Sequence, residues 1–419
     1  MSTPARAGGL AGAADGGEAA GEIEAQSETG SEARTARPPC EVTIVAHDVG
    51  SVGGMERQLA ELILGLIGLG HRVSVIAWTC RLPAQEGLSF HRVPGPRRPF
   101  LLGYLWFMIA GSLVLRRRRR GVVQATGAIV LNRVDSVAIH CCHQVYRAAP
   151  RRSAVPFRIY EGLLGMIKRG AERACVRANS KASFVCVSDG VAQEMREHYP
   201  AAAERILTIH NGVDTEAFAP GSHDSESCAL RAELGIGDER LIAAFVARGW
   251  GHKGLGPVIE ALAQAPDWDL VVAGEGDRRS YGELAASRGV SAAVHWLGVR
   301  GDVHVVYALA DAFVLPSSYE TFSLVTFEAA ASGLPVLVTP VSGVLELIRD
   351  GENGFLITRE PATIGARLNE LARDAALRER LGRRAREAAL SFSWEAMVTK
   401  HEELYARLDE QRSAPARIS

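Results

Sequence analysis

The chain lacks the features that mark several large classes of protein. Its 419 residues carry a formal net charge of −1, so it has no overall positive field that would draw it to nucleic acid. Its seven cysteines are an odd number and form no Cys-x-x-Cys pair or zinc-like spacing. The sequence therefore predicts no nucleic-acid partner, no metal site built on cysteine, and reduced thiols in the cytoplasm.

A secretion signal is also missing. The N-terminus has no charged start followed by an apolar segment and a cleavage site, so we do not expect secretion. Residues 1–39 are rich in Gly, Ala, Glu and Ser and have almost no large apolar side chains. Such a segment cannot bury enough apolar surface to fold, and we expect a disordered N-terminal tail.

The rest of the chain is long enough for two domains. From residue 41 onward, apolar runs of strand length alternate with helical segments in both halves, which predicts an α/β fold with two doubly wound, Rossmann-like parallel sheets. We predict domains at 40–218 and 219–392, a linker near 220–227, and a final helix with a tail at 393–419. The predicted strands are 42–46, 72–77, 121–124, 136–139, 184–187, 206–209, 241–245, 270–273, 294–297, 313–315 and 336–338.

The most informative segment lies between residues 318 and 336. It follows an apolar run that reads as a buried strand, and a helix is expected to begin near Ser323 or Leu324. Glu320 then precedes the helix, while Glu328 lies inside it, about one turn further on. The free N–H groups of the helix start favour an anion, and the strand-helix-strand crossover places them at the carboxyl edge of a sheet. Two merely solvated glutamates are the alternative.

Two cations flank a glycine-rich turn in the second half. Arg248 and Lys253 stand at the ends of Arg248-Gly-Trp-Gly-His-Lys253, directly after a predicted strand. Positive charges at this place can neutralise a leaving diphosphate without a metal ion. An ordinary solvated loop is the alternative.

Glycines open two further turns. Gly53 and Gly54 precede the first long helix, and their lack of side chains lets a phosphate or a sugar approach the backbone. This first loop is not a Gly-x-Gly-x-x-Gly run, which argues against a nicotinamide-dependent dehydrogenase. Gly274 and Glu275 begin a turn after another strand. Simple tight turns are the alternative at both places, as at Asn211-Gly-Val-Asp214.

Residues 318–356 resemble the donor-site segment of the retaining glycosyltransferases of family 4. The resemblance rests on the Glu-x7-Glu pair, Glu320 and Glu328, and on Glu346-Leu-Ile-Arg-Asp-Gly351 and Asn353-Gly-Phe-Leu356. It implies the GT-B fold from about residue 41 to 409, with two facing domains and a C-terminal helix that crosses back to the first. It also implies that Glu320 contacts the transferred sugar and that Glu328 contacts the ribose of the nucleotide.

The resemblance assigns roles to the other motifs as well. His140 and His143 follow a first-domain strand where family members place a histidine near the sugar, and His143 is slightly preferred. A packed pair and a zinc site are the alternatives. The implied catalytic residues are Glu320, His143, His140, Arg248 and Lys253. The implied donor-binding residues are Gly53, Gly54, Arg248, Lys253, Gly274, Glu275, Glu320, Thr321, Phe322, Ser323, Leu324 and Glu328.

The implied activity is retaining transfer of a hexosyl group from a UDP-, GDP- or ADP-sugar to a glycan, lipid-linked or small-molecule acceptor. No side chain is an evident nucleophile, so front-face attack by the acceptor hydroxyl is favoured, with no cofactor and no metal. Asp267-Trp-Asp269 matches the metal motif of another glycosyltransferase architecture, but it precedes a strand and reads as surface. The alternatives are a sugar-nucleotide epimerase with the same two-sheet architecture and a non-catalytic nucleotide-sugar-binding scaffold.

Two segments raise the question of a membrane. Residues 100–115 form an apolar run followed by five arginines, Arg116 to Arg120. The run is slightly short for a membrane span, and a buried helix is the preferred interpretation. The alternative is a shallow docking helix whose arginines contact anionic headgroups, which would make a cytoplasmic protein peripheral on the inner face of the membrane. A second basic cluster, between Arg147 and Arg177, fits either a phosphorylated or lipid-linked acceptor or a solvated helix face.

Overall fold

The computed structural model describes residues 38–50, 53–146 and 155–413. The predicted disordered tail therefore lies outside the described residues, except for Pro38 and Pro39, and so do Arg147, Arg151 and Arg152. All seven cysteines are described, and all are free thiols.

The first half of the described chain forms a seven-stranded parallel sheet in the order β5-β3-β1-β6-β7-β8-β9. Its strands are β1 (Glu41–Val45), β3 (Arg72–Ala77), β5 (Leu88–Arg92), β6 (Val122–Thr126), β7 (Ser136–Ile139), β8 (Ser183–Cys186) and β9 (Ile206–Thr208). A small separate sheet pairs β2 (Asp48–Val49) with β4 (Thr79–Cys80). The helical elements are α1 (Gly54–Gly68), α2 (Phe100–Arg118), α3 (Val155–Ala178), α4 (Asp189–His198) and the 3-10 turn η1 (Pro200–Arg205).

The second half forms a six-stranded parallel sheet in the order β12-β11-β10-β13-β14-β15. Its strands are β10 (Leu241–Arg248), β11 (Trp268–Glu275), β12 (Val294–Gly298), β13 (Ala312–Leu315), β14 (Val336–Val338) and β15 (Phe355–Leu356). The helices are α5 (Asp224–Glu233), α6 (Trp250–Lys253), α7 (Leu255–Leu262), α8 (Arg278–Ser287), α9 (Val303–Leu309), α10 (Leu324–Ala331), α11 (Val344–Leu347), α12 (Pro361–Arg373), α13 (Ala375–Ala389) and α14 (Trp394–Ser413), with a 3-10 turn η2 (Ser291–Ala293).

Alternation along each strand fills both faces of the first sheet. Ile44 of β1 packs with α1 and α14 on one face, whereas its neighbour Val45 packs with α2 on the other. Successive strand residues point to opposite faces, so a sheet covered on both sides needs apolar residues at every position. The nearly continuous apolar strands of the sequence therefore specify a doubly wound sheet.

The order of the strands fixes where a ligand can bind. In the first sheet the chain moves from β1 outward to β3 and β5 and then returns to β6, on the other side of β1. The second sheet repeats this with β10, β11 and β12, followed by β13 beside β10. Open parallel sheets bind ligands outside the carboxyl ends of the strands at such a switch point. The loops after β1, β6, β10 and β13 are therefore the expected ligand-binding loops.

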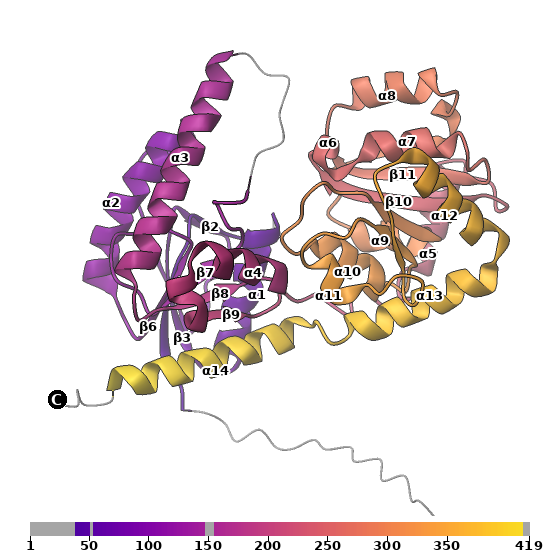
Figure 1. The fold of residues 1–419 in the computed structure, drawn as a ribbon. Helices are drawn as coiled ribbons and strands as arrows, with labels where there is room; N and C mark the ends of the chain where they lie inside the picture. Colours follow the sequence, from indigo (N-terminus) through magenta and orange to yellow (C-terminus); the bar gives the residue numbers. More distant parts are fainter. Residues whose placement is uncertain (1–37, 51–52, 147–154, 414–419) are drawn as a thin grey trace, which may run out of the picture. The chain divides into compact units, whose positions relative to one another are not determined.

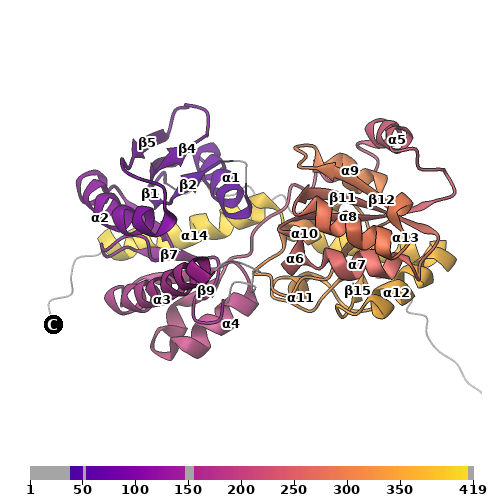
Figure 2. The ribbon, with the colours of Figure 1, turned by 90° about the horizontal axis from the view of Figure 1, so that it is seen from above.

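The last helix returns to the first half of the chain, as predicted. Helix α14, drawn in yellow in Figure 1, packs along α1. Gln58 donates a hydrogen bond to the sulfur of Met397 at 3.4 Å, and a Cβ on Gly65 would come within 2.4 Å of Val398. Two doubly wound parallel sheets with a returning C-terminal helix confirm the predicted architecture (Figures 1 and 2).

Three local predictions are wrong. The predicted linker at 220–227 runs into α5, which begins at Asp224, because acidic residues at 224 and 226 suit the first turn of a helix. Asp269 is buried rather than on the surface, and it pairs with Arg240 at 2.6 Å and His295 at 3.2 Å. The apolar segment after residue 100 is a helix, but only one face of α2 is buried.

Candidate active site

A cleft of about 1200 Å³ is lined by residues of both halves. The first half contributes Gly54, His140 and His143, and the second half contributes Lys253 and the run from Glu320 to Val325. Ligand-binding clefts usually have volumes of about 300–1000 Å³, so this one has room for a large ligand or for two. The cleft lies at the loops after β1, β6, β10 and β13, where the strand order of the two sheets predicts a ligand site.

Glu320 and Lys253 form an ion pair in this cleft. The Nζ atom of Lys253 lies 2.5 Å from Oε1 of Glu320, and the hydroxyl of Ser317 donates to the same oxygen at 2.6 Å. Both ionic side chains are mostly buried, at 18% and 8% exposed. Gly254 makes this approach possible, since a Cβ there would lie 2.3 Å from the carbonyl oxygen of Pro316. The pair holds one positive and one negative group side by side at the switch point of the second sheet.

Two helix starts meet across the cleft. Helix α10 begins at Leu324 after Ser323, which has a φ of 71° and is the one non-glycine residue with positive φ among those described. A backbone in this region costs about 1–3 kcal/mol, and such strain is typical of ligand-binding segments. Helix α1 begins at Gly54, where a Cβ would come within 3.2 Å of a methyl carbon of Leu324. Free N–H groups of both helix starts therefore point toward one region.

Glu328 is held by a residue of the other half. Nη1 of Arg57, from α1, donates to Oε1 of Glu328 at 2.8 Å, and the Tyr307 hydroxyl donates to Oε2 at 3.1 Å. Burial raises the pKa of the Glu328 carboxyl, whereas the Arg57 charge and the Tyr307 hydrogen bond oppose this shift. Arg57 also lies 5.9 Å from the ring centroids of Phe218 and Trp394. Arg57 is thus the counterion of a carboxylate that would otherwise be buried alone.

Arg248 lies apart from the Lys253 pair. Its guanidinium forms an exposed ion pair with Glu275 at 3.2 Å, and neither residue lines the cleft. Gly274 has a φ of 117°, and a Cβ there would collide with the carbonyl oxygen of Ala247 at 1.8 Å. Gly274 therefore lies near the end of β11 rather than in the turn predicted there, and this position requires glycine.

The turn that carries Lys253 contains the glycine fingerprint that the first loop of the chain lacks. Gly249, Gly251 and Gly254 have the Gly-x-Gly-x-x-Gly spacing and follow β10. The first loop lacks this fingerprint, but the chain as a whole does not, so its absence cannot argue against a dehydrogenase. Here the spacing encloses α6, a helix of four residues, rather than opening one long helix.

Both candidate histidines line the cleft and are neutral at pH 7. Burial lowers the pKa of His140 and of His143 to about 4, and for His143 the charges of Lys168 and Arg169 add to the effect. The backbone N–H of His143 donates to Glu172 at 2.9 Å, which fixes the loop. Nε2 of His140 is buried without a hydrogen-bond partner among the described residues. Either ring can therefore exchange hydrogen bonds with a polar ligand as an uncharged group.

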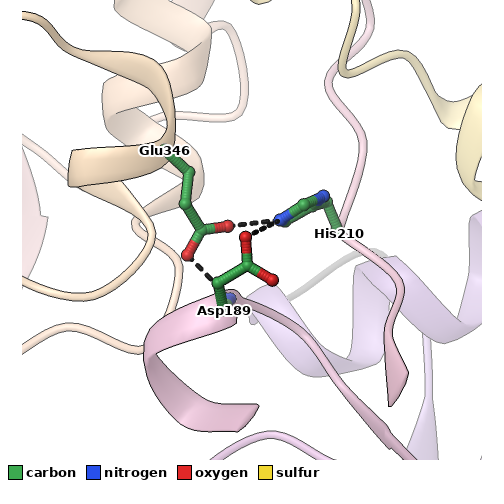
Figure 3. A group of neighbouring side chains, drawn as sticks. All are labelled: Asp189, His210 and Glu346. Atoms are coloured by element: carbon green, nitrogen blue, oxygen red, sulfur yellow. Dashed lines mark hydrogen bonds and ion pairs between the residues drawn. The ribbon is translucent and has the colours of Figure 1, made fainter. Parts of the chain in front are cut away.

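A third contact joins the two halves beside the cleft (Figure 3). Oε2 of Glu346, from α11, forms an ion pair with Nε2 of His210, and the backbone N–H of Asp189 donates to Oε1 at 2.8 Å. The Asp189 carboxylate lies 3.7 Å from the same His210 nitrogen. The ligating atoms lie within 4.8 Å of one another, as a metal site would need. Because Glu346 already bonds to His210 and to the start of α4, we interpret the trio as a direct link between the halves.

The structure thus brings together many of the predicted site residues. Gly54, His140, His143, Lys253, Glu320, Thr321, Phe322, Ser323 and Leu324 line one cleft. Gly53 directly precedes α1, Glu328 lies in α10 without lining the cleft, and Arg248, Gly274 and Glu275 lie at the paired ends of β10 and β11. Sequence reasoning missed Arg57, Tyr307 and Ser317. Arg57 alone had a signal, since it is the cation one turn after Gly53-Gly54.

Comparison with known proteins shows to which class of protein the chain belongs. A model described as glycosyl transferases group 1 matches residues 227–388, and one described as glycosyltransferase family 4 matches residues 52–217. An uncharacterized glycosyltransferase of Methanocaldococcus jannaschii is 26% identical over 377 residues, which are 84% of this chain and 94% of the relative. A D-inositol 3-phosphate glycosyltransferase of Salinispora arenicola is 30% identical over 319 residues, which are 68% of this chain and 71% of the relative.

Solved structures agree on the fold. WaaG, a glycosyltransferase involved in lipopolysaccharide biosynthesis, superposes with a TM-score of 0.74 at 21% identity, over 87% of this chain and 99% of WaaG. Anabaena HepE in complex with UDP-glucose superposes with a TM-score of 0.67 at 19% identity, over 88% of this chain and 100% of HepE. Corynebacterial relatives named D-inositol 3-phosphate glycosyltransferase match this chain over only about half of their own length.

The two-sheet fold and these matches define a glycosyltransferase of the GT-B fold. Within that class, the chain belongs to glycosyltransferase family 4.

Proposed function

We propose that this glycosyltransferase transfers a hexosyl group from a nucleoside-diphosphate sugar to an acceptor hydroxyl with retention of anomeric configuration. The observation that carries the proposal is the Lys253–Glu320 pair beside the start of α10, inside a cleft lined by both halves. A diphosphate needs positive charge and N–H donors, and a sugar needs hydrogen-bond acceptors. This cleft offers both within a few ångströms.

In the proposed complex the donor binds mainly to the second half of the chain. Its diphosphate binds the N–H groups at the starts of α10 and α1 and the Lys253 ammonium, which has three donors and can hold Glu320 and a phosphate oxygen together. Its ribose hydroxyls donate to Glu328, while UDP, GDP and ADP sugars remain the candidates for its base. Arg248 reaches the diphosphate only if its exposed pair with Glu275 opens.

The chemical step breaks the bond between the anomeric carbon and the diphosphate oxygen. The acceptor hydroxyl attacks the same face, and its proton passes to the departing phosphate oxygen. Lys253 and the helix starts stabilise the growing negative charge on the leaving group, so we propose that no metal or cofactor is needed. Glu320 and a neutral His143 or His140 bind the sugar hydroxyls. The acceptor is a glycan, a lipid-linked molecule or a small molecule.

We also propose that the reaction takes place in the cytoplasm. All seven cysteines are free thiols, including Cys141 and Cys142, which are adjacent in the chain. Thiols persist in a reducing compartment, whereas oxidising compartments favour disulfides.

A ligand screen tests the proposal. We expect one nucleotide family among UDP, GDP, ADP and their sugars to raise the melting temperature of the protein, because a ligand that binds only the folded state stabilises it. Lys253→Ala and Glu328→Gln should lose the shift, whereas Arg279→Ala, which removes an exposed pair with Glu283, should keep it. Stabilisation that persists in both site variants, or that no nucleotide produces, would refute the assignment.

Turnover then separates the reaction from its alternatives. Incubation with donor and acceptor extracts, with and without EDTA, should give a glycoside whose anomeric configuration by NMR matches that of the donor. Conversion of the donor to another sugar nucleotide without an acceptor would identify an epimerase instead. Tight donor binding without any transfer would identify a binding protein.

A further inference from the structure

The positive charge of the chain is concentrated in one region. Residues 97–181 contain 17 arginines and lysines and 3 aspartates and glutamates, a formal charge of +14, although the whole chain carries −1. This region includes α2 and α3 and the segment between them. Such an asymmetry indicates a partner surface of negative charge for this region alone.

The outer face of α2 is apolar. Large side chains on it are exposed at spacings of three and four residues, which places them on one face of the helix. They are Leu102, Leu105, Trp106, Ile109 and Leu113, exposed by 39% to 58%. Arg116 and Arg117, also exposed, continue the same face in the last turn. The stripe therefore ends in two cations.

Helix α3 repeats this pattern beside α2. Ile159, Leu163 and Met166 are exposed at the same kind of spacing, and exposed Arg173 and Arg177 continue their face. The two helices lie side by side in Figures 1 and 2, and Tyr160 of α3 accepts a hydrogen bond from the backbone N–H of Leu101 at 3.0 Å. We give the name α2–α3 face to twelve exposed residues of the two helices. They are Leu102, Leu105, Trp106, Ile109, Leu113, Arg116 and Arg117 of α2, and Ile159, Leu163, Met166, Arg173 and Arg177 of α3.

Helix α2 is less buried than a helix in a protein core and more buried than a helix that crosses a membrane alone. By length and composition it is the one described helix that could cross a membrane, but 28% of its most apolar window is buried inside the protein. Its inner residues Tyr104, Phe107 and Leu115 are buried in the core on the first sheet. One row of α2 is thus fixed to the sheet while the opposite row is exposed, as in a helix that lies in a membrane interface.

We propose that the α2–α3 face docks this protein onto a bilayer of anionic lipids. The apolar stripes enter the boundary between headgroups and acyl chains, and the surrounding arginines bind the anionic headgroups. The indole N–H of Trp106 donates to the carbonyl oxygen of Pro94 at 2.7 Å, so the exposed part of the ring can enter this boundary without an unpaired polar group. A second copy of the chain is a poor occupant, because a symmetric contact would place two strongly positive regions against each other.

The same helices reach the cleft with their other side. Phe100 and Tyr104 of α2 and Lys168 of α3 line the cleft that also holds the Lys253–Glu320 pair. A docked protein would therefore hold the first-half side of its cleft close to the bilayer. Resting on the proposed function, this geometry favours an acceptor whose hydroxyl belongs to a lipid-anchored molecule.

Vesicle flotation of the full chain tests the docking surface. The wild type should float with vesicles of an equal mixture of phosphatidylcholine and phosphatidylglycerol, and much less with phosphatidylcholine alone. Ile109→Glu and the double change Arg116→Glu with Arg117→Glu should each weaken partitioning by about tenfold or more, since each basic residue near an anionic surface contributes about fivefold. Val299→Glu, at an apolar side chain of the second half that is 67% exposed, should float like the wild type.

The outcomes separate this proposal from the donor assignment. Flotation that is absent, independent of phosphatidylglycerol, or equal in Ile109→Glu and the wild type would overturn the docking surface. A dimer in light scattering that Ile109→Glu dissolves, without flotation of the wild type, would show that a second copy covers this face and would also overturn it. Nucleotide-induced stabilisation should be the same in Ile109→Glu and the wild type, so loss of docking leaves the donor site testable.

Discussion

Replacing Arg57 with glutamine should destabilise the protein through the buried carboxylate of Glu328. The two side chains are 27% and 7% exposed, and their charged atoms are 2.8 Å apart. Removing one partner of a fully buried pair costs about 3–5 kcal/mol, because the remaining charge has no counterion. Since Arg57 is partly exposed and Tyr307 still donates to Glu328, we expect a loss of about 2–3 kcal/mol near neutral pH.

The loss should depend on pH in a defined direction. The pKa of Glu328 is raised in the folded protein by burial, and removing Arg57 takes away a charge that opposes this shift. A carboxyl whose folded pKa is raised binds more protons folded than unfolded, so its stability contribution falls as the pH rises through the folded pKa. The deficit of Arg57→Gln relative to the wild type should therefore be smaller at about pH 5 than at about pH 8, because ionisation of the raised Glu328 carboxyl exposes the loss of its counterion.

Melting temperatures measured at both pH values would check this prediction. We expect the variant to melt about 2–4 °C below the wild type at the higher pH and much closer to it at the lower pH, since the shift for a given loss of stability is small in a chain of this length. Arg57→Lys keeps a positive charge and should restore most of the difference. Arg279→Gln removes an exposed pair and should change little at either pH. A deficit of equal size at both pH values would refute the role assigned to Arg57.

Three further outcomes are expected from the site. Lys253→Ala should weaken nucleotide binding in calorimetry by about 10- to 100-fold, since it removes a charge-assisted contact worth about 1.5–3 kcal/mol; unchanged affinity would exclude Lys253 from the diphosphate site. Because the pKa of His143 is lowered to about 4, kcat/KM should show no histidine inflection between about pH 6 and 8, and should decline through this group only as the pH falls toward 4. Glu346→Ala should increase the radius of gyration in small-angle scattering, because it removes the contacts to His210 and Asp189; an unchanged radius would mean that other contacts hold the halves.

The sequence was sufficient for the architecture and for much of the cleft. Parallel strands buried on both faces need continuous apolar runs, and these are visible without a structure, as at Leu241–Arg248. The start of α10 was also predictable, because a strand, a short polar loop and a helix in that order place Glu320 at the carboxyl edge. The edge strands β5 and β15 were not found, because β5 is largely exposed and has no continuous apolar run, and β15 has only two residues.

The sequence could not show which face of a helix is buried or which distant side chains form ion pairs. The segment from 100 to 115 is apolar on all sides, so periodicity could not show which face of α2 packs on the sheet and which is exposed. Arg57 and Glu328 are 271 positions apart, and nothing local to either residue indicates the other. Arg248 looked equivalent to Lys253 by spacing, yet β10 ends between them and the chain turns Arg248 toward Glu275.

The contacts between the halves follow one electrostatic pattern. In two of them the second half supplies the carboxylate, Glu328 or Glu346, and the first half supplies the cation or N–H donors. The guanidinium of Arg57 lies close to the rings of Phe218 and Trp394. Phe218 lies where the chain crosses to the second half, and Trp394 lies where α14 returns to the first. Separation of the halves would leave Glu328 buried without its counterion. A ribose that donates to Glu328 in the proposed complex therefore needs Arg57 in place, so donor binding and closure of the two halves should favour each other.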